Sequence, residues 1–191
     1  RILFIVGGSA YFLFWFILMT IDAQAFDPLL GRTLVSLIIF ISLFLTYKSD
    51  FFYNNIVRIA YVLSYILTFY YIFLLIMNHY SNTYCTGMMI IIFGGAMVFK
   101  SNISLLFFLI TCLISVGAGY FFMPDPEVKL FWYLSIVITN SVITYIAMSI
   151  RLNMQEKLSI NNVRLEDAYK EINEQKKIVE IKTIVTLTFN S

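Results

Sequence analysis

The sequence predicts an all-α fold, a polytopic membrane protein with a six-transmembrane-helix bundle followed by a cytoplasmic coiled coil. Composition is the first observation, because 60% hydrophobic and 13% charged residues leave too little polar surface to coat a water-soluble fold. The second is a series of long apolar segments up to position 150, and the third is a charged, heptad-patterned segment after them. We therefore expect a membrane domain over residues 1–150 and a coiled-coil linker over residues 151–191.

Each apolar segment is close to the roughly 20 residues that a helix needs to cross the hydrocarbon core of a bilayer. The second and fourth are short and need flanking Tyr and Phe residues to complete the span. Ionisable side chains are missing from the middle of every segment, which disfavours an ion pump, a proton-coupled transporter or a voltage sensor. In chain order the predicted segments are 2–21, 33–47, 56–77, 84–99, 103–122 and 130–150.

The positions of Lys and Arg predict the orientation of the bundle. With a cytoplasmic N-terminus, the loops on the outer side contain the basic residues Arg32 and Lys129, whereas six basic residues fall on the inner side. The positive-inside rule then places both termini in the cytoplasm. The inner residues are Arg1, Lys48, Arg58, Lys100, Arg151 and Lys157.

Small and polar residues inside the segments predict close helix contacts. The triplets Gly94-Gly95-Ala96 and Gly117-Ala118-Gly119 allow helix backbones to approach each other. Asn140 lies near the midpoint of the sixth segment, where an unpaired amide would cost several kcal/mol. Its partner could be another helix, another subunit or a polar ligand group, and packing between helices is the simplest choice.

Aromatic residues are frequent, at 18% of the chain. Tyr61, Tyr65, Phe69 and Phe73 recur every four residues, so they share one face of the third segment. Such a face usually packs against other helices. It could also form the wall of a pocket for a lipophilic small molecule, because Tyr offers both an apolar ring and a hydroxyl.

No catalytic constellation is recognisable in the 191 residues. We find no Gly-rich phosphate loop and no His paired with a nucleophile, and the single histidine, His79, has no second histidine to share a metal. We therefore expect no catalytic residue, no cofactor and no metal in this segment. The basic residues of the linker are balanced by acids, so nucleic acid is not an expected partner.

Residues after position 150 carry a heptad pattern typical of a coiled coil. Apolar residues recur every seven positions, with Met154 and Ala168 at intermediate seam positions. Both a signalling coil and a plain dimerisation stalk fit this pattern, and both predict a parallel homodimer. The predicted seam consists of Met154, Leu158, Leu165, Ala168, Ile172 and Val179.

Four short stretches of the membrane domain form a distinctive set: Tyr11-Phe12, AFDPLLGR from Ala25 to Arg32, LIMNHYSNTY from Leu75 to Tyr84, and Phe131-Trp132-Tyr133. Met77-Asn78, Ser81 and Tyr84 are the most specific positions. Together these stretches resemble the six-helix membrane domain of the α-hydroxyketone quorum-sensing histidine kinases, and the resemblance extends over nearly the whole chain.

The resemblance implies a receptor in the bacterial inner membrane, where the bundle detects a lipophilic autoinducer among the membrane lipids. It also implies a fused cytoplasmic kinase, which would use ATP and Mg²⁺ and pass a phosphoryl group to a response regulator in a two-component system. Asn190-Ser191 stand where the family has His-Glu. The implied ligand residues are Tyr84, Gly87, Thr139, Asn140 and Thr144. We add Tyr65, Tyr80 and Trp132 as candidate aromatic walls of the pocket.

Two other classes of protein fit part of the pattern. Six-helix membrane domains with a short coiled-coil transducer also precede adenylate and diguanylate cyclase domains, and only sequence after Ser191 would separate a cyclase from a kinase. A carrier for lipids or small solutes is disfavoured, because the segments lack charges at mid-span and contain no internal repeat.

Overall fold

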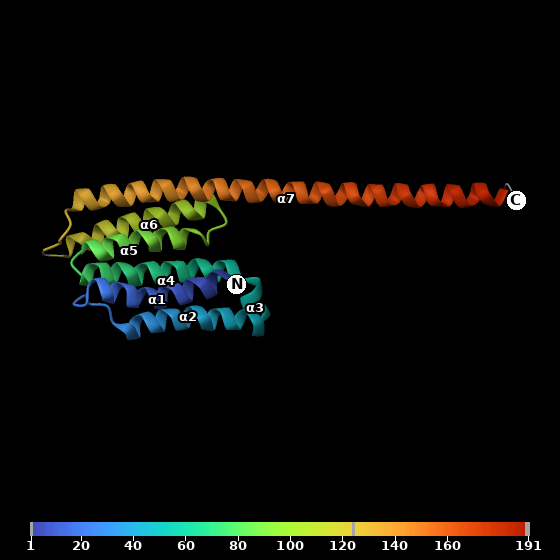
Figure 1. The fold of residues 1–191 in the computed structure, drawn as a ribbon. Helices are drawn as coiled ribbons and strands as arrows, with labels where there is room; N and C mark the ends of the chain where they lie inside the picture. Colours follow the sequence, from blue (N-terminus) through green and yellow to red (C-terminus); the bar gives the residue numbers. More distant parts are fainter. Residues whose placement is uncertain (1, 124, 190–191) are drawn as a thin grey trace. The chain divides into compact units, whose positions relative to one another are not determined.

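The computed structural model describes residues 2–123 and 125–189, and for residue 3 and residues 178–189 it describes the backbone alone. The described chain is helical and contains no strand, so the predicted all-α class is confirmed. It divides into two compact units, Arg1–Ser149 and Ile150–Ser191, next to the expected domain boundary. Figure 1 labels the helices: α1 (Ile2–Ile21), α2 (Leu29–Lys48), α3 (Asp50–Asn54), α4 (Ile56–Met77), α5 (Asn82–Ala96), α6 (Asn102–Phe121) and α7 (Leu130–Phe189).

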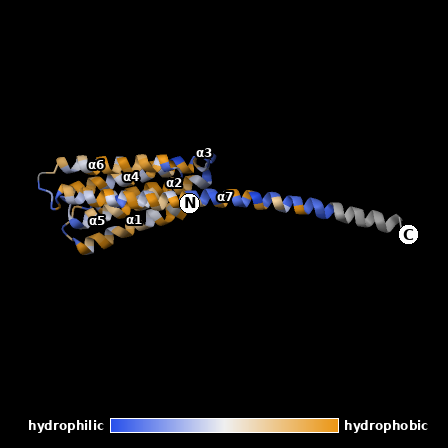
Figure 2. Cartoon of the chain, turned by 90° about the horizontal axis from the view of Figure 1, so that it is seen from above, coloured by the Kyte–Doolittle hydropathy of each residue, from blue (hydrophilic) through white to orange (hydrophobic). Residues whose placement is uncertain are grey.

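Long apolar helices make the first unit compatible with a membrane-spanning bundle. Within the described chain, five helices are long and apolar enough to cross a membrane: α1, α2, α4, α6 and α7. Figure 2 shows the hydrophobic colouring concentrated on the long helices of the first unit and mostly hydrophilic colouring along the coloured part of the second unit. Helix α5 has 15 residues, fewer than a span needs, so a sixth transmembrane helix remains a prediction.

The second predicted segment begins too late. We expected it at residues 33–47 with Arg32 in an outer loop, but α2 begins at Leu29 and includes Arg32. Arginine is a good helix former, and Asp27 neutralises the buried charge of Arg32, with the two side chains in contact at 2.7 Å. Pro28 precedes the first turn in an extended conformation, and its carbonyl accepts from the Gly31 and Arg32 amides.

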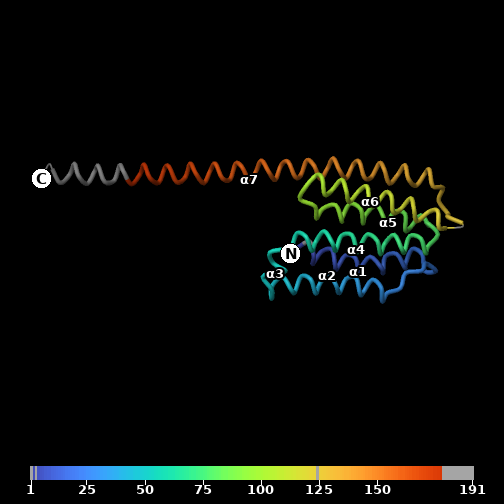
Figure 3. Tube along the Cα trace, turned by 180° about the vertical axis from the view of Figure 1, so that it is seen from behind, coloured from blue at the N-terminus to red at the C-terminus, as the bar shows by residue number. Residues whose placement is uncertain are grey.

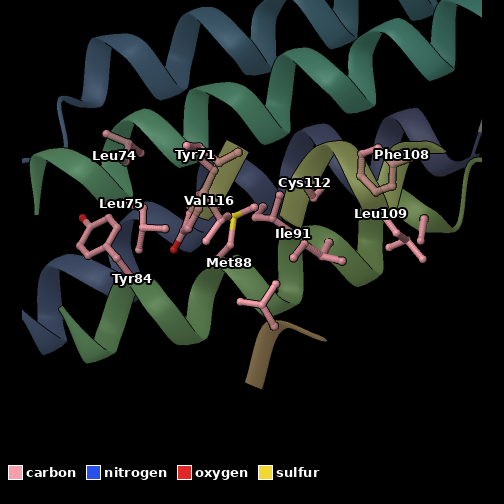
Figure 4. Close-up of a cluster of buried hydrophobic side chains, with 14 of the residues drawn as sticks. Tyr71, Leu74, Leu75, Tyr84, Met88, Ile91, Phe108, Leu109, Cys112 and Val116 are labelled. Carbon is pink, nitrogen blue, oxygen red and sulfur yellow. The ribbon is translucent and has the colours of Figure 1, made fainter. Parts of the chain in front are cut away.

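The core of the first unit lies where α4, α5 and α6 meet. Figure 4 shows Tyr71 from α4, Tyr84 and Met88 from α5, and Cys112 and Val116 from α6 in one cluster. Gly95 on α5 faces the Phe108 ring of α6, where an added Cβ would lie 2.9 Å from the ring. Figure 3, which views the chain from behind, shows α4, α5 and α6 side by side. The small residue therefore allows the close helix contact that the sequence predicted.

The second unit is the charged part of α7. Met154, Leu158, Leu165 and Ile172 are all more than half exposed in the single chain, and Ala168 is exposed as well. An exposed row of heptad residues needs a partner to be buried, so the coiled-coil homodimer remains a prediction. The side chain of Val179 and all of Asn190-Ser191 lie outside the described residues.

Candidate functional site

A fully buried ion pair lies at the start of α2. The Asp27 carboxylate accepts two hydrogen bonds from Arg32 Nε, at 2.8 and 2.9 Å, and one from Arg32 Nη2 at 2.7 Å. Both side chains are completely shielded from solvent. This forked geometry suits a guanidinium, and it leaves no net charge at the site.

Tyrosine side chains from three helices surround the ion pair. Tyr84 on α5 donates its hydroxyl to Asp27 Oδ2 at 2.9 Å, and the Arg32 guanidinium carbon lies 4.9 Å from the centre of the Tyr11 ring of α1. Tyr71 on α4 holds its ring 5.7 Å from the same carbon and is fully buried. Arg32 Nη1 also donates to the Tyr11 carbonyl at 3.3 Å. The pair therefore joins α1, α2, α4 and α5.

The loop between α1 and α2 is fastened by side chains from other elements. Asn78, at the end of α4, accepts from the Phe26 amide at 2.6 Å and donates to the Phe26 carbonyl at 2.8 Å. The Trp15 indole donates to the Asp27 carbonyl at 2.8 Å. These hydrogen bonds position Asp27, because they satisfy the backbone amide and carbonyl of Phe26 before it and its own backbone carbonyl.

A strained turn connects α4 and α5. His79 and Tyr80 have φ angles of 52° and 54°, the left-handed region that bulky residues rarely adopt. The His79 amide donates to the Ile76 carbonyl and the Tyr80 amide to the Leu75 carbonyl, which is the hydrogen-bond pattern of a Schellman helix end. The Glu127 amide donates to the His79 carbonyl at 2.8 Å and ties the turn to the loop before α7.

Tyr80 projects from this turn into the interior. Its hydroxyl donates to the Val116 carbonyl of α6 at 2.7 Å, and its ring centre lies 5.6 Å from that of Tyr133 on α7. Burial raises the pKa of the Tyr80 hydroxyl, which therefore stays protonated and remains a donor. Asn78 and Tyr80 thus link the ion-pair loop to α6 and α7 through one turn.

An apolar cavity of about 410 Å³ lies between α1, α4 and α5. This volume falls within the roughly 300–1,000 Å³ of small-molecule sites. Small residues contribute to its walls, among them Gly7, Ala10, Ala60 and Gly94. Its polar lining residues include Ser64, whose hydroxyl is already bound to the Ala60 carbonyl, and Lys100. The cavity therefore suits a lipophilic molecule.

Tyr11 connects the cavity with the ion pair. It lines the cavity, and its ring lies against the Arg32 guanidinium. Its hydroxyl, like those of Tyr70 and Tyr71, is buried without a hydrogen-bond partner among the described residues. A buried hydroxyl without a partner loses the hydrogen bonds that it made to water, so burying Tyr11 at this position costs free energy.

The predicted ligand residues on α4 and α5 lie in different surroundings. Tyr84 belongs to the ion-pair network, and Gly87 faces the Tyr71 hydroxyl, which would collide with any Cβ at that position. Tyr80 contacts α6 and α7. Tyr65 is half-buried and packs edge-on against the Phe99 and Phe108 rings.

The predicted ligand residues on α7 are only partly buried. Thr144 is buried, and Asn140 donates to the Met89 carbonyl of α5 at a long 3.5 Å. Thr139 is exposed with its hydroxyl on the Ser135 carbonyl, and Trp132 is 63% exposed. None of the eight predicted residues lines the cavity among the described lining residues. Their role in ligand binding remains a prediction.

The ion pair itself was missed as a site by reasoning from the sequence. Asp27 and Arg32 were both assigned to an outer loop, where charges are solvated and carry little information. One signal was present, since the stretches around Tyr11, Asp27–Arg32 and Asn78–Tyr84 were those that carry the family resemblance. The structure brings these three stretches into one hydrogen-bonded cluster.

The fold and the cavity define a helical protein with several apolar helices long enough to span a membrane. Searches against family models, curated proteins and solved structures find no match to this chain.

Proposed function

We propose that this chain is the membrane receptor domain of a bacterial sensor histidine kinase that detects a lipophilic small molecule. The observation that carries the proposal is the partly open apolar cavity of the first unit, whose lining includes Tyr11 beside a buried ion pair. A purely structural bundle gains stability by filling such a space, because each cavity weakens packing. A receptor needs the space for its ligand.

Transmission of the signal would use the contacts between the ion-pair network and α7. Asn78 holds the loop that carries Asp27, and two residues later Tyr80 packs on Tyr133 of α7. A ligand that binds two arrangements of these contacts unequally would shift their populations. In the full-length protein, the parallel homodimeric coil would carry this change to the kinase domain and its response regulator.

A thermal-shift screen of the purified protein tests the receptor proposal. The panel contains medium-chain α-hydroxyketones, related acyl signals and membrane lipids. A ligand at 100 times its Kd stabilises the native state by about 2.7 kcal/mol, so binding is readily measurable. A saturable shift that depends on chain length supports a receptor, whereas no saturable shift with any compound rejects it.

Two variants test the predicted ligand residues on α5 and α7. Asn140→Leu removes the contact with the Met89 carbonyl, and Tyr84→Phe removes the hydroxyl bound to Asp27. Loss of binding in a folded Asn140→Leu protein places the ligand between α5 and α7. Unchanged binding in both folded variants excludes the Asn140 amide and the Tyr84 hydroxyl as ligand contacts.

A further inference from the structure

We propose that the cavity between α1, α4 and α5 binds a single-chain amphiphile, with its anionic head group at Lys100 and its chain directed toward Tyr11. This inference rests on the proposed receptor function and names its ligand class. It differs from the predicted site on α5 and α7 in both position and head-group chemistry.

The cavity is elongated along the helices. Its lining residues extend from Phe4 to Phe14 on α1 and from Ile56 to Leu67 on α4. At 1.5 Å per residue each wall is roughly 15 Å long. A slot of this length with apolar walls fits an extended acyl chain.

The two ends of the cavity differ in charge. Lys100 is the charged residue among the described lining residues, and it is exposed in the connection after α5. Its amide is fixed by the Tyr61 hydroxyl at 2.9 Å, which places it beside the first turns of α4. Arg58, also exposed, lies in the first turn of α4 next to the lining residue Val57. This end can therefore attract an anion.

The opposite end cannot replace Lys100 as an anion site. Tyr11 lies there against Arg32, but the Arg32 guanidinium is already neutralised by Asp27 at 2.7 Å. An anionic head group would have to be desolvated beside Asp27 and would gain no free cation. The Tyr11 hydroxyl is enclosed by protein, so this end offers the chain an apolar wall.

Two glycines keep the cavity open without a packing role. At Gly7 and Gly94 an added Cβ would meet no atom within 4 Å, and both residues line the cavity. Glycine inside a helix costs roughly 0.5–1 kcal/mol relative to alanine. Gly95 differs, because its Cβ would lie 2.9 Å from Phe108. Close packing therefore explains Gly95, whereas the half-buried Gly7 and the exposed Gly94 leave open space along the wall for an occupant.

Binding of radiolabelled dodecanoate to the protein in phosphatidylcholine nanodiscs tests the site. We expect saturable binding to the wild type and at least tenfold weaker binding to Gly7→Leu and Gly94→Leu, which fill the cavity. Ala118→Leu adds the same side chain at an exposed position of α6 and should bind normally. If both filled variants are folded and bind like the control, the cavity is not the site.

Competition by related compounds tests the head group and the direction of the chain. Methyl dodecanoate should compete about fivefold less well than dodecanoate, the size of effect expected for a partly exposed ion pair. Lys100→Gln should abolish this difference between acid and ester, whereas Lys100→Arg should keep it. Lys48→Gln is the control at the same end. Equal binding of acid and ester to the wild type overturns the anionic head group.

The same measurements separate this inference from the receptor proposal. If an α-hydroxyketone stabilises Gly7→Leu and Gly94→Leu as well as wild type, the receptor proposal stands and this cavity assignment fails. If dodecanoate binds in the cavity but no ligand alters autophosphorylation of the full-length protein, the receptor proposal fails and the site stands. If dodecanoate shows no saturable binding, but radiolabelled lysophosphatidylglycerol binds the wild type and not Gly7→Leu or Gly94→Leu, the occupant is a membrane lipid.

Discussion

Replacing Asp27 by Asn should strongly destabilise the membrane unit. The change keeps the shape of the side chain but leaves the Arg32 guanidinium positively charged in a position with no solvent exposure. Breaking a buried ion pair by removing one partner typically costs about 3–5 kcal/mol. We expect a loss of this size in the free energy of unfolding.

Three further variants separate the charge from the hydrogen bonds. Tyr84→Phe removes one hydrogen bond to the carboxylate and should cost about 1.5–3 kcal/mol. The double variant Asp27→Asn/Arg32→Met contains no buried charge, so it should recover most of the stability lost in Asp27→Asn. Arg32→Met alone leaves Asp27 unpaired and should be destabilised like Asp27→Asn.

Reversible unfolding in mixed micelles, as a function of the mole fraction of dodecyl sulfate, measures these differences. The fluorescence of Trp15 can follow the transition, since its indole is bound to the Asp27 carbonyl. A Trp132→Phe background removes the signal of the other tryptophan. If Asp27→Asn lies within about 1 kcal/mol of the wild type, Arg32 is hydrated in the folded protein and the reasoning is refuted.

Further predictions concern packing, the turn and the coil. Gly87→Ala should cost about 1–3 kcal/mol in unfolding experiments because its Cβ collides with the Tyr71 hydroxyl, whereas Gly94→Ala should be neutral or stabilising; equal effects would contradict the packing. Tyr80→Phe should lower the free energy of unfolding by about 1 kcal/mol through loss of the bond to the Val116 carbonyl, and an unchanged stability would count against that bond. If the proposed kinase output follows the coil, insertion of three or four residues after Met154 should change its activity, and insertion of seven should restore it; an activity independent of insertion length would exclude transmission through the coil.

The helical class and most helix positions could be predicted because they depend on local composition. Apolar runs near the length of a bilayer predict α1, α4 and α6 closely. The start of α2 could not be predicted in the same way, because it depends on a contact between Asp27 and Arg32 that a hydropathy pattern treats as two separate charges. The end of α5 was also misplaced, since Phe99 leaves the helix to stack on Tyr61 at 4.5 Å.

The candidate site could be predicted from the sequence less well than the fold. Asn140 was expected to need a partner in the bundle, and the structure gives it a long contact with α5. The cavity depends on how α1, α4 and α5 are spaced, which no local pattern specifies. Gly7 shows the difficulty, because a glycine that makes close packing possible and one that leaves open space look the same in a sequence.

The short distance along the chain between Asp27 and Arg32 has a consequence for membrane insertion. Only five positions separate them, so their contact can form as soon as α1 and α2 make a hairpin, at little cost in loop entropy. Each charge alone would oppose transfer of the chain around it, the loop before α2 or the first turn of α2, into a lipid environment. Paired, the two charges let the hairpin enter as a neutral unit, and Tyr71 and Tyr84 then enclose the pair when α4 and α5 arrive.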